Sequence, residues 1–576
     1  MRILGIHNGH NASACLLENG SIRFCIQEER LTNSKNYFGF PFRSIETILT
    51  LANLGTDDID SVAMASSYMP VMSNPFDVVD AYRKQASFVG RLNSVARGNI
   101  YGILVKTRLN SIYNKRARRK RLEALESSGL ERCRTIFVDH HLCHAATAYY
   151  GSPWRDEPVL VLTNDGSGDG LCSTVYIGKD GELTKVAETP KGHSLGNIYA
   201  RTTFLLGLSP WEHEWKVMGL APYAPASGID KSYEVFRRLI KIAGNNPLAF
   251  EKSISESTEL IYPRLRRELE LHRFDWIAGG VQKYTEELLC QWVRNCVNAT
   301  GIRRVALAGG VFMNVKANKR IMELDDVEDL FIFPSCGDES ISIGAAYQVY
   351  VEECREQGKP SNIQPLREIY LGPSFTDQDV EQAISKIEHQ NFESRYVKDI
   401  ESRIAELLAR GEIVARCKGR MEFGARALGN RSILADAADY SCVRVINMMV
   451  KKRDFWMPFA PVIMKERQND YIVDPKGISA PYMMLSFDTT RRRNEFNAAV
   501  HQADLTARPQ ILEREMNPEF YSILEEFERI TGKGILLNTS FNLHGYPIVY
   551  GPREALWVFL NSDLNHLALG NYLLQK

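Results

Sequence analysis

The sequence predicts an α/β protein whose N-terminal part contains an internal duplication. Residues 2–27 have the pattern of a three-stranded meander, with an Asn-Gly turn at 19–20, and a helix and a strand at 61–65 follow. The apolar run 159–163 then leads through a Gly/Asp-rich turn into a second meander, with an Asp-Gly turn at 180–181. Paired meanders of this kind favour the ATPase fold of actin, sugar kinases and chaperones, because their turns can approach a nucleotide from two sides. Two unrelated meanders remain the alternative.

The length of 576 residues exceeds what one hydrophobic core supports, so at least two domains are expected. The polar stretch 356–365 contains Gly358, Pro360 and Pro365 and is the best linker candidate. We therefore predict a first domain at 1–360, with a helical insertion at about 76–128. A second α/β domain is predicted at 366–576.

Composition limits the partners of the chain. Hydrophobic residues make up 44% and charged residues 24%, as in ordinary globular proteins, and 70 basic side chains balance 70 acidic ones. No net charge therefore draws the protein toward nucleic acid or an anionic membrane. The N-terminus lacks a signal-peptide pattern, no window reaches the ~18 apolar residues of a membrane span, and the eleven cysteines are dispersed. We expect a cytoplasmic protein with no membrane partner.

Two histidines and two aspartates form a candidate metal site. His140 and His144 are four residues apart, so a helix would place them on one face, where both imidazoles can bind one ion. Asp165 and Asp338 each follow a predicted strand and would complete the set if the sheet brings them together. Imidazole and carboxylate ligands suit divalent iron, and also manganese or zinc. The alternatives are core or surface histidines and turn-capping aspartates.

Several turns in the first domain are candidate nucleotide contacts. Gly309 and Gly310 follow a strand and precede a helix, where backbone N–H groups can approach phosphate. The Walker lysine is missing, so this turn is not a P-loop. Gly166 and Asn314 lie on turns of the same kind, and Lys216 could reach a phosphate or cap a helix.

The second domain contains a basic cluster interrupted by glycines. Residues 419–432 alternate arginine with glycine and small residues, which lets guanidinium groups bind a phosphate bidentately over a tight backbone. The predicted anion-binding residues are Arg426, Arg431, Lys451, Arg453, Arg508, Asn538 and Ser540. The basic run 115–121 has instead the pattern of a solvated helix face, with a patch for acidic ligands as the alternative.

Together these motifs resemble the NodU/CmcH family of ATP-dependent O-carbamoyltransferases over essentially the full length. The segments that carry the resemblance are 10–14, 27–30, 140–146, 164–166, 216–219, 308–314, 335–344, 419–432 and 537–542. The resemblance implies an N-terminal domain like that of the tRNA threonylcarbamoyltransferases, joined to a C-terminal YrdC-like domain.

The resemblance also implies a two-step reaction. The YrdC-like domain would use carbamoyl phosphate and ATP, with Mg²⁺, to make carbamoyl-adenylate. The N-terminal domain, with its metal, would pass the carbamoyl group to a hydroxyl of a small-molecule acceptor in a biosynthetic pathway, such as a natural product or a sugar. His10 is the candidate base, because an imidazole can take a hydroxyl proton near neutral pH. Arg30 and Lys35 would complement phosphate charge at the catalytic site.

Two positions depart from the family pattern. Asn11 stands where the family has aspartate, so a carboxylate that orients His10 is not assumed. Met457 stands where the family commonly has an arginine that contacts phosphate, and Arg453 is the nearby substitute.

Two other function classes are alternatives to this reaction. A tRNA-modifying relative could use the run 115–121 for phosphate contacts, but the zero net charge and the lack of interleaved aromatic residues argue against nucleic acid. An ATP-driven switch without transfer chemistry would have no use for the second phosphate-type cluster. The sequence leaves a homo-oligomer open.

Overall fold

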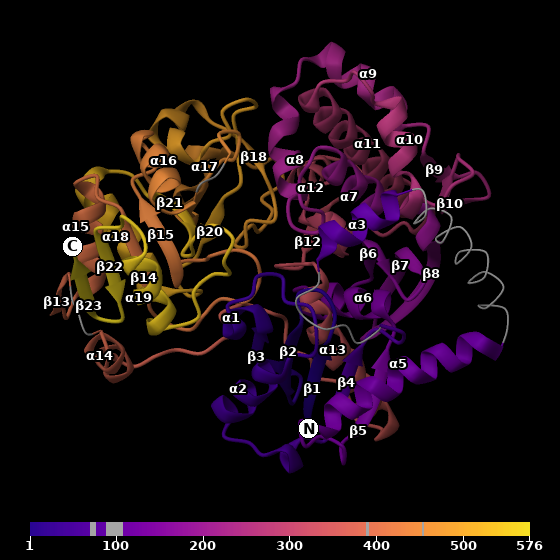
Figure 1. Ribbon diagram of the computed structural model, residues 1–576, viewed down its shortest axis with the longest axis horizontal. Coiled ribbons are helices and arrows are strands. Elements are labelled where there is room, and N and C mark those ends of the chain that lie inside the picture. The colour runs from indigo at the N-terminus through magenta and orange to yellow at the C-terminus, as the bar shows by residue number, and fades with distance from the viewer. Residues whose placement is uncertain (70–76, 88–107, 388–390, 452–453) are drawn as a thin grey trace. The chain divides into compact units, whose positions relative to one another are not determined.

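The computed structural model describes residues 1–69, 77–87, 108–387, 391–451 and 454–576. Arg453 and part of the predicted insertion 76–128 lie outside these ranges. The chain divides into two compact units, which Figure 1 shows coloured along the sequence. The first unit is Met1–Glu28 with Asn36–Leu366, and the second is Glu29–Lys35 with Arg367–Lys576.

The first unit contains two five-stranded sheets with the same strand order. One has the order β3-β2-β1-β4-β5 and the other the order β8-β7-β6-β11-β12. In each, the first three strands along the chain form an antiparallel meander, and two parallel strands extend the sheet on the other side of the first strand. The strands are β1 (Arg2–His7), β2 (Ser13–Glu18), β3 (Ser21–Gln27), β4 (Ser61–Ala65), β5 (Arg134–Val138), β6 (Val159–Gly168), β7 (Leu171–Lys179), β8 (Glu182–Pro190), β11 (Arg304–Ala308) and β12 (Asp329–Ile332). The repeated order confirms that the two predicted meanders are related in topology.

The central strands of these sheets are apolar because they are covered on both faces. Every residue of β4 is buried, whereas β8, at the end of its sheet, is mostly exposed. Helix α13 (Ile341–Glu356) packs against β1 and against helix α6 (His140–Gly151), as the two ribbon views show. A Cβ atom at Gly344 of α13 would lie 1.9 Å from the carbonyl oxygen of Cys143, so this close helix crossing requires glycine.

The remaining elements of the first unit are mostly helices. They are α2 (Phe42–Ala52), α3 (Val78–Ala86), α5 (Arg108–Glu126), α7 (Leu195–Leu205), α8 (Glu214–Leu220), α9 (Ala226–Phe236), α10 (Tyr262–Glu268), α11 (Phe274–Thr300) and α12 (Val315–Met322), with the strand pair β9 (Ile240–Ala243) and β10 (Asn246–Lys252). Helix α1 (Glu28–Thr32) runs from the first unit into the second.

The second unit is also mixed α/β. Its main sheet has the order β13-β23-β22-β14-β15-β21-β16-β20, and a small sheet has the order β17-β18-β19. The strands are β13 (Glu393–Tyr396), β14 (Val414–Cys417), β15 (Arg431–Ala435), β16 (Ala460–Met464), β17 (Ile472–Val473), β18 (Phe487–Thr489), β19 (Thr506–Ala507), β20 (Gln510–Leu512), β21 (Ile535–Ser540), β22 (His566–Leu569) and β23 (Tyr572–Gln575). The helices are α14 (Asp377–Ser385), α15 (Ile400–Ala409), α16 (Ser441–Ile446), α17 (Gln468–Tyr471), α18 (Pro518–Thr531) and α19 (Pro552–Leu560).

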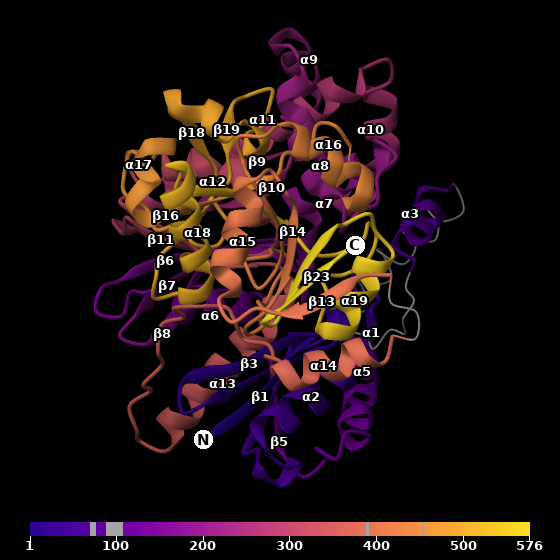
Figure 2. The same cartoon turned by 90° about the vertical axis from the view of Figure 1, so that its left-hand side faces the viewer.

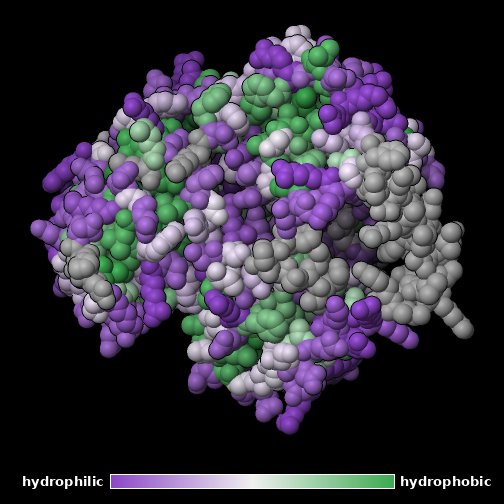
Figure 3. Space-filling model, in the orientation of Figure 1, coloured by the Kyte–Doolittle hydropathy of each residue, from purple (hydrophilic) through white to green (hydrophobic). Residues whose placement is uncertain are grey.

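The core of the second unit lies where α15 and α18 cover the main sheet. Leu408 of α15 and Phe520 and Phe527 of α18 are fully buried there. The face in Figure 3 is mostly hydrophilic, with hydrophobic residues in scattered groups. Within the described ranges, the helices fall short of the length and apolar character that crossing a membrane requires.

Candidate functional site

The four predicted metal ligands come together in the first unit. His140 and His144 lie one turn apart on α6, Asp165 lies on β6, and Asp338 begins the turn that precedes α13. One donor atom from each residue lies within 4.8 Å of each of the others. Helix α6 begins in the right place because the carboxylate of its N-cap, Asp139, accepts hydrogen bonds from two backbone N–H groups of the first turn.

The spacing of these donor atoms fits a shared ion. His140 Nε2 lies 3.4 Å from Asp165 Oδ2 and 3.6 Å from Asp338 Oδ1, and His144 Nε2 lies 3.3 Å from Asp338 Oδ1. Ligands that are each about 2.0–2.2 Å from a common ion are separated by roughly 3–3.5 Å. Both histidines are fully buried, and their Nε2 atoms have no hydrogen-bond partner among the residues that the structure describes. Buried donors left without a partner in this way are expected where a cation binds.

The charges of the cluster also favour a cation. Burial opposes protonation of His140, but Asp338 and Asp165 outweigh it and raise the pKa of His140 to about 9. Burial alone would raise the pKa of Asp338, but His140 and His144 overcome this effect and hold that pKa well below its usual value. The aspartates therefore create a local excess of negative charge that a divalent ion would neutralise.

The glycines predicted to contact nucleotide phosphate lie beside this cluster. The N–H of Gly310 donates to Asp165 Oδ1 at 3.0 Å, so this turn holds a predicted metal ligand. Gly309 has a φ of 108°, and a Cβ there would lie 2.2 Å from the carbonyl oxygen of Asn164. Only glycine allows the chain that follows β11 to approach Asn164 of β6 this closely.

Three other nucleotide candidates occupy separate places in the first unit. The prediction that Gly166 lies on a turn after the strand is wrong, because β6 extends to Gly168 and includes both Asp165 and Gly166. Asn314 caps α12, because its Oδ1 accepts the N–H of Ala317 at 3.0 Å, and its amide also pairs with Gln282. Lys216 is buried on α8, with Nζ 5.8 Å from the ring centroid of Trp215.

The candidate base His10 lies between aromatic side chains. Its ring centroid is 5.4 Å from that of Trp211 and 6.3 Å from that of Phe38. Asn11 adopts a φ of 58°, a left-handed conformation that asparagine tolerates well, and its buried Oδ1 has no hydrogen-bond partner within the described residues. The departure from aspartate therefore leaves an amide, rather than a carboxylate, beside His10.

His7 is a residue near the site that the sequence did not single out. It is fully buried, burial lowers its pKa to about 4, and its Nε2 lies 2.9 Å from the carbonyl oxygen of His10. His7 ends β1 opposite Ser13, as Asn164 pairs with Ser173 in the second sheet. An alignment of β1 with β6 pairs His7 with Asn164, and this comparison could have found His7 from the sequence.

In the second unit, a buried carboxylate shapes the arginine loop, which we define as residues 419–431. Glu422 Oε1 accepts hydrogen bonds from the N–H groups of Leu428 at 2.8 Å, Asn430 at 3.2 Å and Arg431 at 3.1 Å. The side chain that organises the backbone of this basic loop is therefore acidic, which composition alone does not reveal.

Arg431 fastens the arginine loop to its surroundings. It is fully buried and donates to the carbonyl oxygens of Tyr550 at 3.1 Å, Asn430 at 2.9 Å and Gly419 at 3.2 Å. Arg426 and Arg508 are only half-buried, which leaves them more accessible than Arg431. Met457, at the position where the family has arginine, is buried.

Lys451, Asn538 and Ser540, which are also predicted to bind anions, all make hydrogen bonds within the second unit. Lys451 Nζ donates to Ser540 Oγ at 3.0 Å and to Asn542 Oδ1 at 2.6 Å. Asn538 Nδ2 donates to the carbonyl oxygen of Ala427 at 3.1 Å, next to Arg426. Asn538 and Ser540 are alternate residues of β21 and so lie on the same face of the strand.

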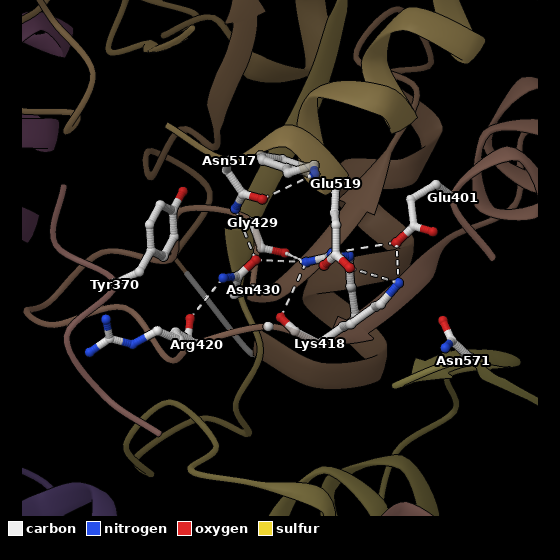
Figure 4. Close-up of polar contacts among 12 residues, drawn as sticks. Tyr370, Glu401, Lys418, Arg420, Gly429, Asn430, Asn517, Glu519 and Asn571 are labelled. Carbon is white, nitrogen blue, oxygen red and sulfur yellow. Dashed lines mark hydrogen bonds and ion pairs between the residues drawn. The ribbon is translucent and has the colours of Figure 1, made fainter. Parts of the chain in front are cut away.

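A charge network, which Figure 4 shows in part, lies beside the arginine loop. Arg416 of β14 is fully buried and donates to Asn430 Oδ1 at 2.8 Å, and its guanidinium lies 3.3 Å from the carboxylate of Glu519. Lys418 Nζ lies 2.7 Å from Glu401 and 3.1 Å from Glu519. Glu401 comes from α15 and Glu519 from α18, which are distant from each other in sequence. Their negative charges neutralise Arg416 and Lys418, which lie just before the arginine loop.

Arg30 and Lys35, predicted at the catalytic site of the N-terminal domain, belong to the second unit. Arg30 is buried, and its Nη2 donates to the carbonyl oxygen of Gly424 at 2.5 Å. Lys35 is half-buried. Arg30 therefore contacts the arginine loop.

Comparison with known proteins identifies the family. Residues 2–347 match the N-terminal part of the carbamoyltransferases, and residues 405–576 match their C-terminal part. The chain belongs to the carbamoyltransferase family. The metal cluster thus lies in the N-terminal carbamoyltransferase region, and the arginine loop lies in the C-terminal one.

Among its relatives are bacterial nodulation proteins and an archaeal protein. The chain is 31% identical to nodulation protein NolNO of Sinorhizobium fredii, over 98% of this chain and 79% of the relative. It is 26% identical to nodulation protein U of the same species, over 95% and 94%. An uncharacterised protein of Methanocaldococcus jannaschii is 33% identical over 83% of this chain and 80% of its own length.

Solved structures resemble the chain only distantly. HypF in a phosphate- and nucleotide-bound form is 14% identical, with a TM-score of 0.33, over 60% of this chain and 55% of HypF. Component A of (R)-2-hydroxyglutaryl-CoA dehydratase from Acidaminococcus fermentans is 15% identical, with a TM-score of 0.32, over 60% and 97%. TM-scores this low do not establish a shared fold.

Proposed function

We propose that this carbamoyltransferase is an ATP-dependent O-carbamoyltransferase that activates carbamoyl phosphate as carbamoyl-adenylate and delivers the carbamoyl group to a small-molecule hydroxyl. The observation that carries this proposal is the presence of two chemically different centres in separate units. His140, His144, Asp165 and Asp338 converge in the first unit, and the arginine loop lies in the second. A single-step transferase would not need both.

The first step belongs to the second unit. Water releases phosphate from carbamoyl phosphate, the carbamate oxygen attacks the α-phosphorus of ATP, and pyrophosphate leaves with its Mg²⁺. Arg426, Lys451 and Arg508 supply positive charge for these phosphates, and Asn538 and Ser540 supply neutral contacts. Glu422 and Arg431 keep the loop in its conformation by holding its backbone.

The second step belongs to the first unit. The acceptor oxygen attacks the carbamoyl carbon, the bond from that carbon to the phosphate oxygen breaks, and AMP leaves. His10 removes the proton from the acceptor hydroxyl. The Fe²⁺, Mn²⁺ or Zn²⁺ that the four ligands suit would neutralise negative charge on the nucleotide phosphate. Keeping the adenylate within the protein prevents its hydrolysis.

The repeated strand order supports an ATPase-type fold for the first unit, and the resemblance suggests a YrdC-like fold for the second. The two steps would then fall in the predicted domains 1–360 and 366–576, with residues 29–35 joining the second. We further propose that the enzyme acts in the cytoplasm, in a biosynthetic pathway.

The tRNA-modifying alternative receives little support from the basic run 115–121. Arg121 is buried, and Arg119 lies 3.1 Å from Glu123. Arg118 stacks over the ring of Phe137 at 4.9 Å. Half of the cations in the run are therefore engaged within the protein, and Lys115, Arg116 and Lys120 remain exposed for a nucleic-acid backbone. Salt-dependent retention of the protein on tRNA would favour this alternative.

The two-centre proposal is tested by separating the steps. Purified protein given ATP and radiolabelled carbamoyl phosphate should release pyrophosphate. Arg426→Ala should abolish this release, whereas His144→Ala should retain it and lose transfer to an acceptor. Arg529→Ala, on the exposed side of α18, is the control and should behave as wild type. Equal loss of pyrophosphate release in Arg426→Ala and His144→Ala would overturn the division of labour. Candidate acceptors are then screened by the mass shift of one carbamoyl group.

A further inference from the structure

Two members of the basic run on α5 turn toward the protein. Arg118 is half-buried, and its Nε donates to the carbonyl oxygen of Ser67 at 3.4 Å. Arg121 is fully buried, with its guanidinium 4.9 Å from the ring centroid of Phe137. Its Nη1 donates to the carbonyl oxygen of Ser66 and its Nη2 to that of Ala65, both at 2.5 Å. Arg121 therefore holds the chain where β4 ends, whereas its neighbours Arg119 and Lys120 are exposed.

Asp169 holds the same segment from another side. Its carboxylate accepts hydrogen bonds from the N–H groups of Ser67 at 2.7 Å and Tyr68 at 3.0 Å. It also accepts the N–H of His140 at 2.9 Å. Asp169 therefore ties the segment that follows β4 to the first residue of α6.

Between these two anchors, Ser66 adopts an unusual backbone conformation. Its φ is 64°, a left-handed value that serine rarely adopts and that needs support from its surroundings. The side chain is buried, and its Oγ lies 3.0 Å from Nδ1 of His140. Arg121 and Asp169 therefore hold Ser66 in a strained conformation. A conformation held in this way indicates that the position of the Ser66 hydroxyl, next to His140, has a function.

The hydrogen bond to Ser66 determines which ring nitrogen of His140 is available. When Nδ1–H donates to Ser66 Oγ, the lone pair of Nε2 points toward Asp165 and Asp338, which lie 3.4 and 3.6 Å away. His144 differs, because its Nδ1 is buried without a hydrogen-bond partner among the described residues. Of the two histidines, His140 is thus the one whose Nδ1, on the side of the ring away from the other predicted ligands, has a hydrogen-bond partner in the part of the chain that the structure describes.

We propose that Ser66 is a positioning residue for the metal-binding His140, and that Arg121 and Asp169 hold Ser66 in its strained conformation. This inference rests on the metal site of the proposed function. It gives the basic run of α5 a structural role in that site, reached through Arg121. Loss of such a supporting hydrogen bond typically weakens metal binding by about 10- to 100-fold.

The test measures metal affinity without the reaction. Chelator-treated full-length protein is titrated with Mn²⁺ alone and with Zn²⁺ alone by calorimetry. Ser66→Ala and Ser66→Gly should both bind about 10-fold more weakly than wild type. Ser67→Ala is the matched control, because Ser67 contacts Asp169 through its backbone N–H, which alanine retains. This control should bind as tightly as wild type.

Two further measurements make the result decisive. Ser66→Gly relieves the positive φ and should be at least as thermally stable as wild type, so its weaker binding cannot reflect unfolding. His144→Ala should abolish the same binding. Wild-type affinity in both Ser66 variants, together with loss in His144→Ala, would overturn the role of Ser66 and leave the metal site in place. Unchanged affinity in His144→Ala would overturn the metal site and this inference with it.

Discussion

The guanidinium of Arg30 donates to the carbonyl oxygen of Gly424 at 2.5 Å, across 394 positions of sequence. Arg30 lies near the start of the chain, yet it is buried in the second unit, and its partner Gly424 is two residues before Arg426 in the arginine loop. Its position links the residues around 30 to the arginine loop and to the first step of the proposed reaction.

Replacing Arg30 should therefore slow adenylate formation. A hydrogen bond from a charged donor contributes about 1.5–3 kcal/mol, so Arg30→Ala should lower the rate of pyrophosphate release roughly 10- to 100-fold. Arg23→Ala removes an exposed arginine of β3 and should leave the rate unchanged. Normal pyrophosphate release with a loss confined to acceptor transfer would instead return Arg30 to the transfer site that the sequence suggested.

The carboxylate of Glu422 should be a major source of stability for the second unit. Glu422→Ala leaves three buried N–H groups without their acceptor, at about 1–3 kcal/mol each, and should lower the free energy of unfolding by several kcal/mol. Glu422→Gln keeps one carbonyl oxygen and should lose clearly less. Urea unfolding measures both, with the exposed Glu515→Ala as control. Equal losses in the glutamine and alanine variants would contradict this role of the oxygen.

Arg121 and Arg119 should differ sharply although both belong to the same basic run. Lysine cannot reach two carbonyl oxygens as a guanidinium does, so Arg121→Lys should destabilise the protein by roughly 1–3 kcal/mol in urea unfolding. Arg119→Lys changes an exposed ion pair and should alter stability by less than about 0.5 kcal/mol. Equal changes in the free energy of unfolding for Arg121→Lys and Arg119→Lys would show that the burial of Arg121 does not contribute to stability.

Glu214 should make stability depend on pH. Burial raises its pKa from 4.5 to about 7, and its Oε1 accepts the N–H of Trp211 at 2.8 Å. The unfolded chain therefore releases this proton at lower pH than the folded protein, and the free energy of unfolding falls as pH rises from about 4.5 through about 7. Glu214→Gln keeps the acceptor and removes the charge. The variant should be more stable than wild type at pH 8, by at most roughly 3 kcal/mol.

At pH 5 the difference between Glu214→Gln and wild type should shrink to less than about 1 kcal/mol, because Glu214 is then protonated in the folded protein and only partly ionised in the unfolded chain. Urea unfolding at the two pH values measures both differences. A difference of the same size at pH 5 and pH 8 would show that Glu214 does not titrate in this range.

Local sequence patterns were enough to predict the duplicated meanders, but they proposed Asp165 and Asp338 as metal ligands only if the sheet brings them to the histidines. Strand runs and their Asn-Gly or Asp-Gly turns are local signals, and the spacing of His140 and His144 places both on one helix face. The expectation that α/β sheets gather the ends of parallel strands at one edge favoured Asp165, which in the structure lies within β6 rather than after it.

Features that depend on long-range packing could not be predicted in this way. The basic run 115–121 does not reveal that Arg121 faces the end of β4, because that depends on how α5 packs. Composition likewise does not show that Glu422 lies inside a basic loop. The membership of residues 29–35 in the second unit depends on contacts with residues far along the chain.

That membership also limits how such genes can exchange parts. The chain passes between its units after residues 28, 35 and 366, so the second unit is encoded in two separate stretches. A recombinant that takes everything beyond residue 366 from a relative would pair the imported arginine loop with the host's own Arg30. Functional chimaeras are therefore expected mainly when residues 29–35 are exchanged together with residues 367–576.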